Sequence, residues 1–252
     1  MFIDTHCHLD DPALFDRLRE VIGNAGKSGI NRFVVPGVNP EGWSRIAAIA
    51  HEIEGISPAF GLHPMLADHY NKEVLVELAR YADAAVAIGE IGLDYTLPEI
   101  PRERQMPAFR DQLRLAVMMG LPLLIHCRKA FRDLLLIMRE EHVERIGGIM
   151  HAFSGSTEVA RECIRLGFAI SVAGPVTYRN AVRPIDLVRN IPLEHLVLET
   201  DAPDMTPEPF RGNSNEPAYL VETAKKVAEI KGVSLEEVAA VTTRNAERLL
   251  RL

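Results

Sequence analysis

Two histidines near the N-terminus, His6 and His8, are spaced so that both could bind one divalent metal ion. They follow Phe2 and Ile3, which begin a predicted short apolar strand. Side chains alternate along a strand, so His6 and His8 point to one side and Cys7 points to the other. Two neighbouring imidazoles can chelate a divalent ion through nitrogen. The pair alone is equally consistent with two histidines that cap a strand by hydrogen bonding.

Further nitrogen and carboxylate donors follow other predicted strands. Glu90 ends the fourth strand, His126 the fifth, His151 the sixth and Asp201 the eighth. Each has an ordinary structural explanation, such as a salt bridge for Glu90 or a capped turn for Asp201. Six donors at matching positions favour a metal site instead, because acids buried among apolar strand residues must be paired or metal-bound. Four histidines and two carboxylates suffice for two ions, with Glu90 best placed to bridge them.

The elements that would position these donors alternate along the chain. Strands are predicted at the N-terminus and over 31–36, 57–61, 85–88, 122–125, 147–150, 168–172 and 196–200. Helices are predicted over 12–29, 41–54, 73–82, 105–119, 129–142, around 159–164, and over 181–190, 218–231 and 234–249, with Ser234 and Glu237 as a capping box. Loops are expected over 96–104 and 202–217.

This alternation predicts one α/β domain, residues 1–252, folded as a closed (β/α)₈ TIM barrel of metallo-dependent hydrolase type. An open doubly wound sheet lacks support, because no strand is followed by a G-x-G-x-x-G or a P-loop. In a barrel, the C-terminal strand ends converge on one mouth, where active sites lie. We therefore expect all six donors to meet there.

Composition limits the partners and the compartment. The formal net charge of −7 argues against broad coating of duplex nucleic acid, though not against a phosphate substrate held locally. Three widely spaced cysteines indicate reduced thiols, and no secretory signal or membrane-spanning apolar run is recognised. We expect a cytoplasmic protein, a monomer, with no membrane contact.

Several motifs resemble, in order, those of the TatD family of metal-dependent hydrolases, which belongs to the amidohydrolase-like barrels. The resemblance covers nearly the whole chain and rests on the segments 2–8 (FIDTHCH), 61–64 (GLHP), 89–95 (GEIGLDY), 124–130 (LIHCRKA), 151–156 (HAFSGS) and 198–203 (LETDAP). It implies that the metal ligands are His6, His8, Glu90, His126, His151 and Asp201. One departure is Asp204-Met205, where many members have an aromatic residue and leucine, and this bears on substrate preference.

The resemblance implies a magnesium-dependent deoxyribonuclease, including 3′→5′ exonuclease action on single-stranded DNA or RNA. We expect two divalent ions per subunit, magnesium first, while nitrogen-rich donors also suit zinc, manganese or nickel. One ion should be held by His6, His8 and Asp201. The other should be held by His126 and His151, with Glu90 between the two ions. The ions would activate water for attack on a phosphodiester, with Asp201 as general base and Glu90 as the catalytic bridge.

Two residues are candidates for substrate binding. Arg128 could clamp a phosphate oxygen or form a surface ion pair. His63, after the third strand, could contact substrate or cap a turn. A basic rim is expected for a polynucleotide, from Arg102, Arg104, Arg128, Lys129, Arg132, Arg179, Arg183 and Arg211.

Two other functions remain open. The same metal site could hydrolyse a small ester, lactone or amide, although related barrels often have a metal-bridging lysine on strand four, where this chain has Glu90. A non-enzymatic binding protein is disfavoured, because a scaffold does not need six converging donors.

Overall fold

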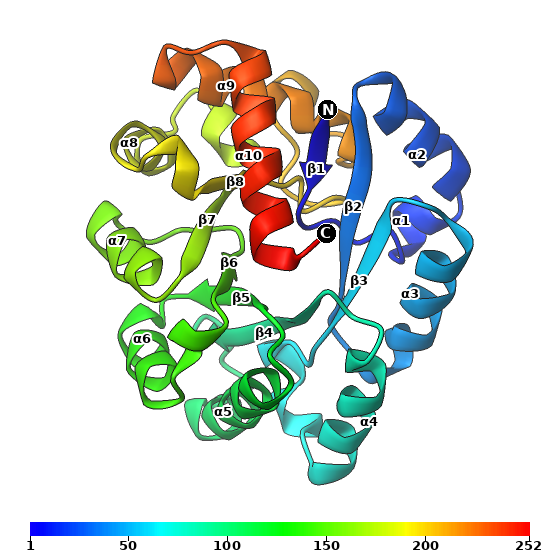
Figure 1. Ribbon diagram of the computed structural model, residues 1–252, viewed down its shortest axis with the longest axis vertical. Helices are drawn as coiled ribbons and strands as arrows, with labels where there is room; N and C mark the ends of the chain where they lie inside the picture. Colours follow the sequence, from blue (N-terminus) through cyan, green and yellow to red (C-terminus); the bar gives the residue numbers. More distant parts are fainter.

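Eight parallel strands form the centre of the computed structural model, which describes all 252 residues (Figure 1). Each strand pairs with the next along the chain, in the order β1 to β8. The strands are β1 (Phe2–Asp4), β2 (Ile30–Gly37), β3 (Ile56–Phe60), β4 (Ala87–Asp94), β5 (Leu123–Arg128), β6 (Gly148–Met150), β7 (Phe168–Val172) and β8 (Leu196–Leu198). The Thr5 amide and hydroxyl both donate to Leu198 O at 3.0 Å, which joins the first strand's end to the last. The predicted (β/α)₈ barrel is confirmed.

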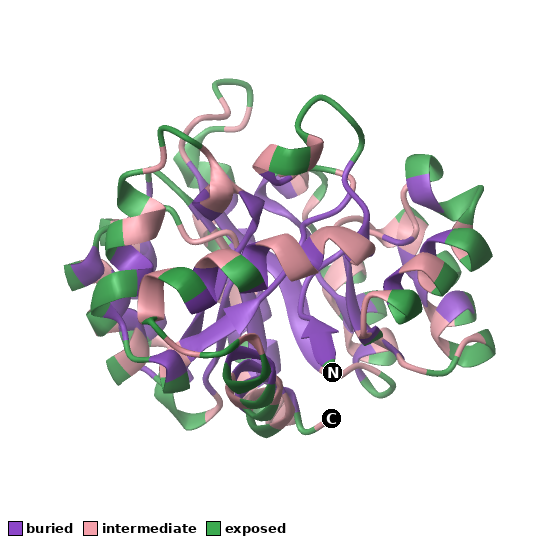
Figure 2. Ribbon diagram, turned by 90° about the horizontal axis from the view of Figure 1, so that it is seen from above, coloured by how far each residue is buried: buried purple, intermediate pink, exposed green.

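Helices surround the strands and cover them from solvent. They are α1 (Pro12–Phe15), α2 (Leu18–Lys27), α3 (Pro40–Glu52), α4 (Lys72–Ala82), α5 (Arg102–Met119), α6 (Phe131–Glu140), α7 (Thr157–Arg165), α8 (Arg183–Asn190), α9 (Leu220–Lys231) and α10 (Leu235–Leu250). Apolar side chains on their inner faces pack against the strands, while the outer faces are exposed (Figure 2). None of these helices has both the length and the apolar character that crossing a membrane requires.

The barrel interior is apolar at the N-terminal end of the strands. Every strand contributes one side chain to this layer: Ile3, Val34, Ala59, Ala87, Leu124, Ile149, Ala169 and Val197. Ala246 and Leu250 of α10 complete the cluster, and α10 crosses this end of the barrel (Figure 1). Ser234 caps α10 as predicted, because its hydroxyl accepts a hydrogen bond from the Glu237 amide at 3.1 Å. One end of the barrel is therefore closed by packing, and chemistry is confined to the other.

The prediction of one continuous helix over 12–29 is wrong. The structure breaks it into α1 and α2 at Asp16 and Arg17, and Arg17 has non-helical dihedral angles. The guanidinium of Arg17 donates to Glu216 at 2.7 Å, in the long segment before α9. This contact spans 199 residues and could not be inferred from local periodicity.

Four element boundaries also differ from the prediction near the functional end. β4 continues to Asp94, so Glu90 lies inside the strand and not at its end. His126 likewise lies inside β5, and β8 ends at Leu198, three residues before Asp201. α5 begins at Arg102, inside the predicted loop. The Gln105 side chain fixes this segment, because its amide accepts from Asp94 N and donates to Asp94 O.

Candidate metal centre

The six predicted donors meet at the C-terminal mouth of the barrel. His6 and His8 follow β1, Glu90 and His126 project from β4 and β5, and His151 and Asp201 follow β6 and β8. Glu90, from the middle of β4, lies between the others and has two distinct sets of neighbours. The prediction that these residues converge therefore agrees with their positions in the fold.

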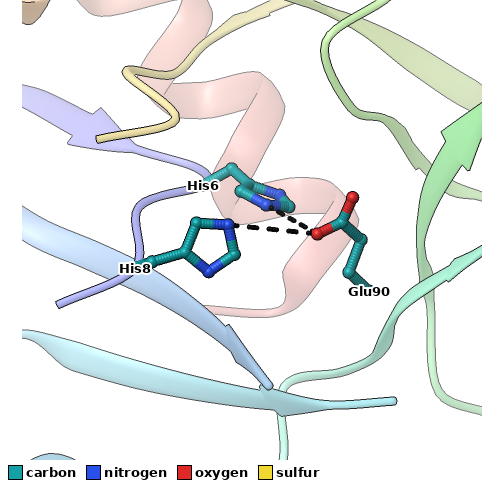
Figure 3. Close-up of side chains that lie close together, drawn as sticks. All are labelled: His6, His8 and Glu90. Carbon is teal, nitrogen blue, oxygen red and sulfur yellow. Dashed lines mark ion pairs between the residues drawn. The ribbon is translucent and has the colours of Figure 1, made fainter. Parts of the chain in front are cut away.

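One carboxylate oxygen of Glu90 faces the histidines after β1. Its Oε2 lies 3.3 Å from His6 Nε2 and 4.0 Å from His8 Nε2 (Figure 3). Asp201 Oδ1 is on the same side, 3.8 Å from His6 Nε2 and 3.5 Å from His8 Nε2. Two imidazole nitrogens and two carboxylate oxygens therefore share this space.

The other carboxylate oxygen of Glu90 faces a second group of histidines. Its Oε1 lies 3.0 Å from His126 Nδ1, 3.5 Å from His63 Nε2 and 3.6 Å from His151 Nε2. His151 also reaches the first group, since its Nε2 is 3.7 Å from Asp201 Oδ1. The two groups are thus joined through Glu90 and through His151.

The side chains in this cluster fit metal binding. His6 is fully buried, and neither of its ring nitrogens makes a hydrogen bond within the protein. Its ring stacks on His151 with centroids 3.5 Å apart, an arrangement that is unfavourable if both rings are protonated. Leaving a buried polar atom unpaired costs about 1–3 kcal/mol. Coordination of a divalent ion through these nitrogens would satisfy them.

The electrostatics of the cluster favour ionised carboxylates. Burial opposes ionisation of Glu90, but His151, His63 and His6 bring its pKa well below the ordinary value. Burial likewise opposes ionisation of Asp201, and the adjacent His151 and His8 lower its pKa. Both residues therefore carry negative charge near neutral pH, as ligands of a divalent cation must.

Burial and the neighbouring charges shift the pKa values of the histidines in different directions. Burial and the neighbouring His151 lower the pKa of His6. Burial also works against protonation of His8 and His151, yet nearby carboxylates raise their pKa values to about 9 and about 10. The carboxylates thus favour positive charge at these nitrogens, and a metal ion would compete with protons for them.

Two buried acids that the sequence analysis did not select lie directly behind the cluster. Asp94 Oδ2 is 3.2 Å from His126 Nε2, and Glu199 Oε2 is 3.0 Å from His151 Nδ1. Glu199 also accepts a hydrogen bond from the Ala152 amide at 2.7 Å. Each acid faces the imidazole nitrogen that points away from Glu90, a pattern common behind metal-binding histidines. Their only signal in the sequence was their place in the strand-end motifs 89–95 and 198–203.

Asp4, which the sequence analysis did not identify either, links β1 to the segment after β8. Its carboxylate accepts from the Thr200 amide at 2.9 Å and pairs with the Thr200 hydroxyl. Burial raises the pKa of Asp4 to about 7. Asp4 thus holds the segment that carries Asp201 beside the segment that carries His6.

His63 lies against Glu90, and it also caps a turn. Its Nδ1 accepts a hydrogen bond from the Met65 amide at 3.2 Å. A neutral imidazole that accepts at Nδ1 carries its proton at Nε2. Burial lowers the pKa of His63 to about 4, which favours that neutral form. His63 is therefore a hydrogen-bond donor toward the site, and this form does not suit metal ligation through Nε2.

Part of the predicted basic rim is free of internal ion pairs. Arg104 pairs with Asp68, and both Arg179 and Arg211 pair with Glu208. Arg128, Lys129 and Arg183 form no salt bridge within the protein, and all three are exposed. They line one hollow beside the site, so their charge is available to an anionic ligand.

Comparison with known proteins agrees with this geometry. The family described as TatD related DNase matches residues 3–251. An uncharacterized metal-dependent hydrolase of Bacillus subtilis, YabD, is 43% identical, and the match covers all of both chains. A second such hydrolase, YcfH of Escherichia coli, is 35% identical over 99% of this chain and 96% of its own.

A solved structure extends the agreement to the fold. The TatD homologue YjjV of Escherichia coli superposes with a TM-score of 0.95, at 32% identity, over 100% of this chain and 98% of its own. Sequence family, barrel and donor cluster all lead to one assignment. The chain belongs to the TatD family and is a metal-dependent hydrolase.

Proposed function

We propose that this hydrolase is a nuclease that cleaves phosphodiester bonds of single-stranded DNA or RNA at a two-metal site, as a 3′→5′ exonuclease. The observation that carries the proposal is the position of Glu90, whose two carboxylate oxygens each face a different group of histidines. A bridging carboxylate between two ions is a feature of two-metal phosphodiester hydrolysis. The family description as DNase-related points to the same substrate class.

The metal ligands divide around Glu90. His6, His8 and Asp201 would hold one ion, and His126 and His151 the other. Magnesium is our first expectation, and the imidazole-rich donor set also accommodates zinc, manganese or nickel. When bound, such ions supply an activated water and stabilise charge on the leaving oxygen.

Asp201 is the proposed general base. Its Oδ1 lies within 3.8 Å of nitrogens on His6, His8 and His151, so it borders the space where the ions and water would meet. The neighbouring His151 and His8 lower its pKa, so the carboxylate is ionised near neutral pH. The histidines around it would stabilise the carboxylate before the proton is transferred.

His63 and Arg128 are the proposed substrate contacts. The Nε2 proton of His63 points toward Glu90 Oε1 at 3.5 Å, at the edge of the cluster, and could be donated to a phosphate oxygen. Arg128 lies two residues beyond His126 on the same strand and has no internal ion-pair partner. With Lys129 and Arg183, it provides the positive charge that a phosphate backbone requires.

The test is nucleotide release from end-labelled single-stranded DNA and RNA, with magnesium, with manganese and with EDTA. We expect metal-dependent shortening from the 3′ end, abolished by EDTA and by His126→Ala. The matched control is His51→Ala, which removes an exposed histidine on α3 and should leave the activity unchanged. Circular dichroism would verify that both variants are folded.

Two outcomes would contradict the proposal. Shortening from the 5′ end would exclude the assigned polarity but leave a nuclease. No cleavage by folded, metal-loaded protein would reject the nuclease. A panel of small esters, lactones and amides would then be tested with the same variants.

A further inference from the structure

A cavity of about 270 Å³ lies beside the candidate metal centre, above the end of β7. Its wall begins at Ala152, the residue directly after His151. Most of the lining is apolar, with Phe153, Val176, Leu187 and Met205 on its sides. Its volume is near the lower end of roughly 300–1,000 Å³ found for small-molecule sites. It is therefore suited to one ring system and not to a whole nucleotide chain.

Ser171, one of the residues that line this cavity, has a buried hydroxyl without a hydrogen-bond partner. Ser171 lines the wall and is 2% exposed, and its Oγ makes no hydrogen bond within the protein. A buried hydroxyl is ordinarily paired, because leaving it unpaired costs free energy. A ligand with a polar edge would satisfy it. Since a hydroxyl both donates and accepts, it can pair with either kind of group.

The cavity lies next to the hollow that holds the free cations. Ser154, Gly155 and Arg183 line both spaces. The hollow also contains Arg128 and Lys129, together with two acidic residues, Glu158 and Asp186. An apolar space therefore adjoins a cationic one within a few residues of His151. Bases and phosphates alternate in this way along a single strand.

We propose that the apolar cavity is a nucleobase subsite, which holds the base of the nucleotide next to the scissile phosphate. This inference rests on the proposed nuclease function. The ring of Phe153 would stack on the base, and Ser171 Oγ would hydrogen-bond to its polar edge. Stacking is tolerant of sequence because every base has a π-face. The hydroxyl adds no strict choice between bases, so the subsite recognises the presence of a base.

Met205 gives this subsite a feature particular to the chain. It belongs to the Asp204-Met205 pair, at which the sequence departs from the pattern of many TatD members, and it forms part of the cavity wall. A flexible thioether adapts to aromatic rings of different shape. The departure therefore falls where a base would be held.

The first test compares an oligodeoxynucleotide with the same strand carrying an abasic residue beside the cleaved bond. The wild-type protein should cleave the normal strand about tenfold faster, an effect in the range of one base-stacking contact. Ser154→Trp would fill the cavity entrance from an exposed position and should reduce the ratio of the two rates to about one. Ser44→Trp, at an exposed serine on α3 outside both spaces, should keep the wild-type ratio.

The second test measures binding without catalysis, in EDTA. Calorimetry with 2′-deoxyadenosine should detect binding to wild type and to Ser44→Trp, and none to Ser154→Trp. 2-Deoxyribose alone should not bind. The conservative variant Ser171→Ala should weaken nucleoside binding by about fivefold, because it removes one hydrogen bond. Ser171→Ala therefore still tests the subsite if Ser154→Trp does not fold.

The two tests separate the subsite from the nuclease. Equal rates on normal and abasic strands, without nucleoside binding, would overturn the subsite and leave the nuclease standing. Nucleoside binding that is lost in Ser154→Trp, without cleavage of any strand, would support the subsite and reject the nuclease. Binding of a nucleoside that neither Ser154→Trp nor Ser171→Ala alters would also overturn the proposal, since the base would then lie elsewhere.

Discussion

The two ends of this barrel are built from the same eight strands but from opposite kinds of side chain. At the N-terminal end, each strand contributes one aliphatic residue, and α10 covers the layer with Ala246 and Leu250. At the C-terminal end, the strands and the residues that follow them supply imidazoles and carboxylates around Glu90. At the N-terminal end, packing buries apolar surface. At the C-terminal end, some buried polar atoms, such as the ring nitrogens of His6, have no hydrogen-bond partner.

This difference separates stability from function within one fold. Burial of aliphatic groups stabilises the barrel whether or not a ligand is present. The polar end is stabilised further when its unpaired nitrogens bind a ligand. Substitutions at the two ends should therefore change different measurements, and the following experiments test that separation.

The largest effect is expected from Glu90→Gln at the polar end. Loss of the charge between the two histidine groups should lower metal-dependent hydrolysis by about 1,000-fold, because a metal site supplies several kcal/mol of transition-state stabilisation. Bound metal, measured by mass spectrometry, should fall as well. The control Glu77→Gln removes an exposed glutamate from α4. Full metal content in Glu90→Gln would show that the Glu90 carboxylate is not needed to hold the metal.

The second effect lies at the packed end, in Leu250→Ala. Leu250 is 2% exposed, and truncation of a buried leucine costs about 2–5 kcal/mol of unfolding free energy. Urea titration should show this loss, while metal content and activity of the folded protein stay at wild-type levels. Leu136, 53% exposed on α6, provides the matched control Leu136→Ala. A fall in metal binding without loss of stability would contradict the separation.

A smaller effect is expected behind the metal site, in Asp94→Asn. The substitution keeps the size of the side chain but removes the charge that faces His126 Nε2 at 3.2 Å. Metal affinity should decrease about 10- to 100-fold, as for other acids behind metal-binding histidines. Competition with a fluorescent chelator measures this directly, with Asp83→Asn at an exposed position as control. Unchanged affinity would mean that Asp94 does not orient His126.

The smallest effect is expected at the cap of α10, in Ser234→Ala. Removing the hydroxyl that accepts from the Glu237 amide should cost about 1 kcal/mol. The melting temperature should fall by about 2–4 °C, without change in metal content. Ser214→Ala, at an exposed serine in the loop before α9, should leave the melting temperature unchanged. An equal shift in both variants would argue against the cap.

Most residues of the candidate site could be predicted from the sequence, because they lie near the C-terminal ends of predicted strands. His6, His8, Glu90, His126, His151 and Asp201 were selected by their position after apolar runs, and the barrel brings them together as such positions require. The position of Glu90 inside β4 could not be predicted from the sequence. The β4–β5 pairing shifts register between Ile88 and Ile91, and a Cβ at Gly92 would lie 1.8 Å from His126 O. A propensity pattern does not reveal such a close approach of two strands.

The sequence by itself determined the alternation of eight strands with helices, the donors near the strand ends and the cap at Ser234, because each depends on local spacing or on the geometry common to all barrels. Tertiary structure alone decided which acid faces which histidine, as for Asp94 with His126 and Glu199 with His151. It also decided the contact of Arg17, at the break between α1 and α2, with a partner 199 residues away. These contacts join segments distant in the chain, and their free energies depend on distances and burial that only the folded barrel defines.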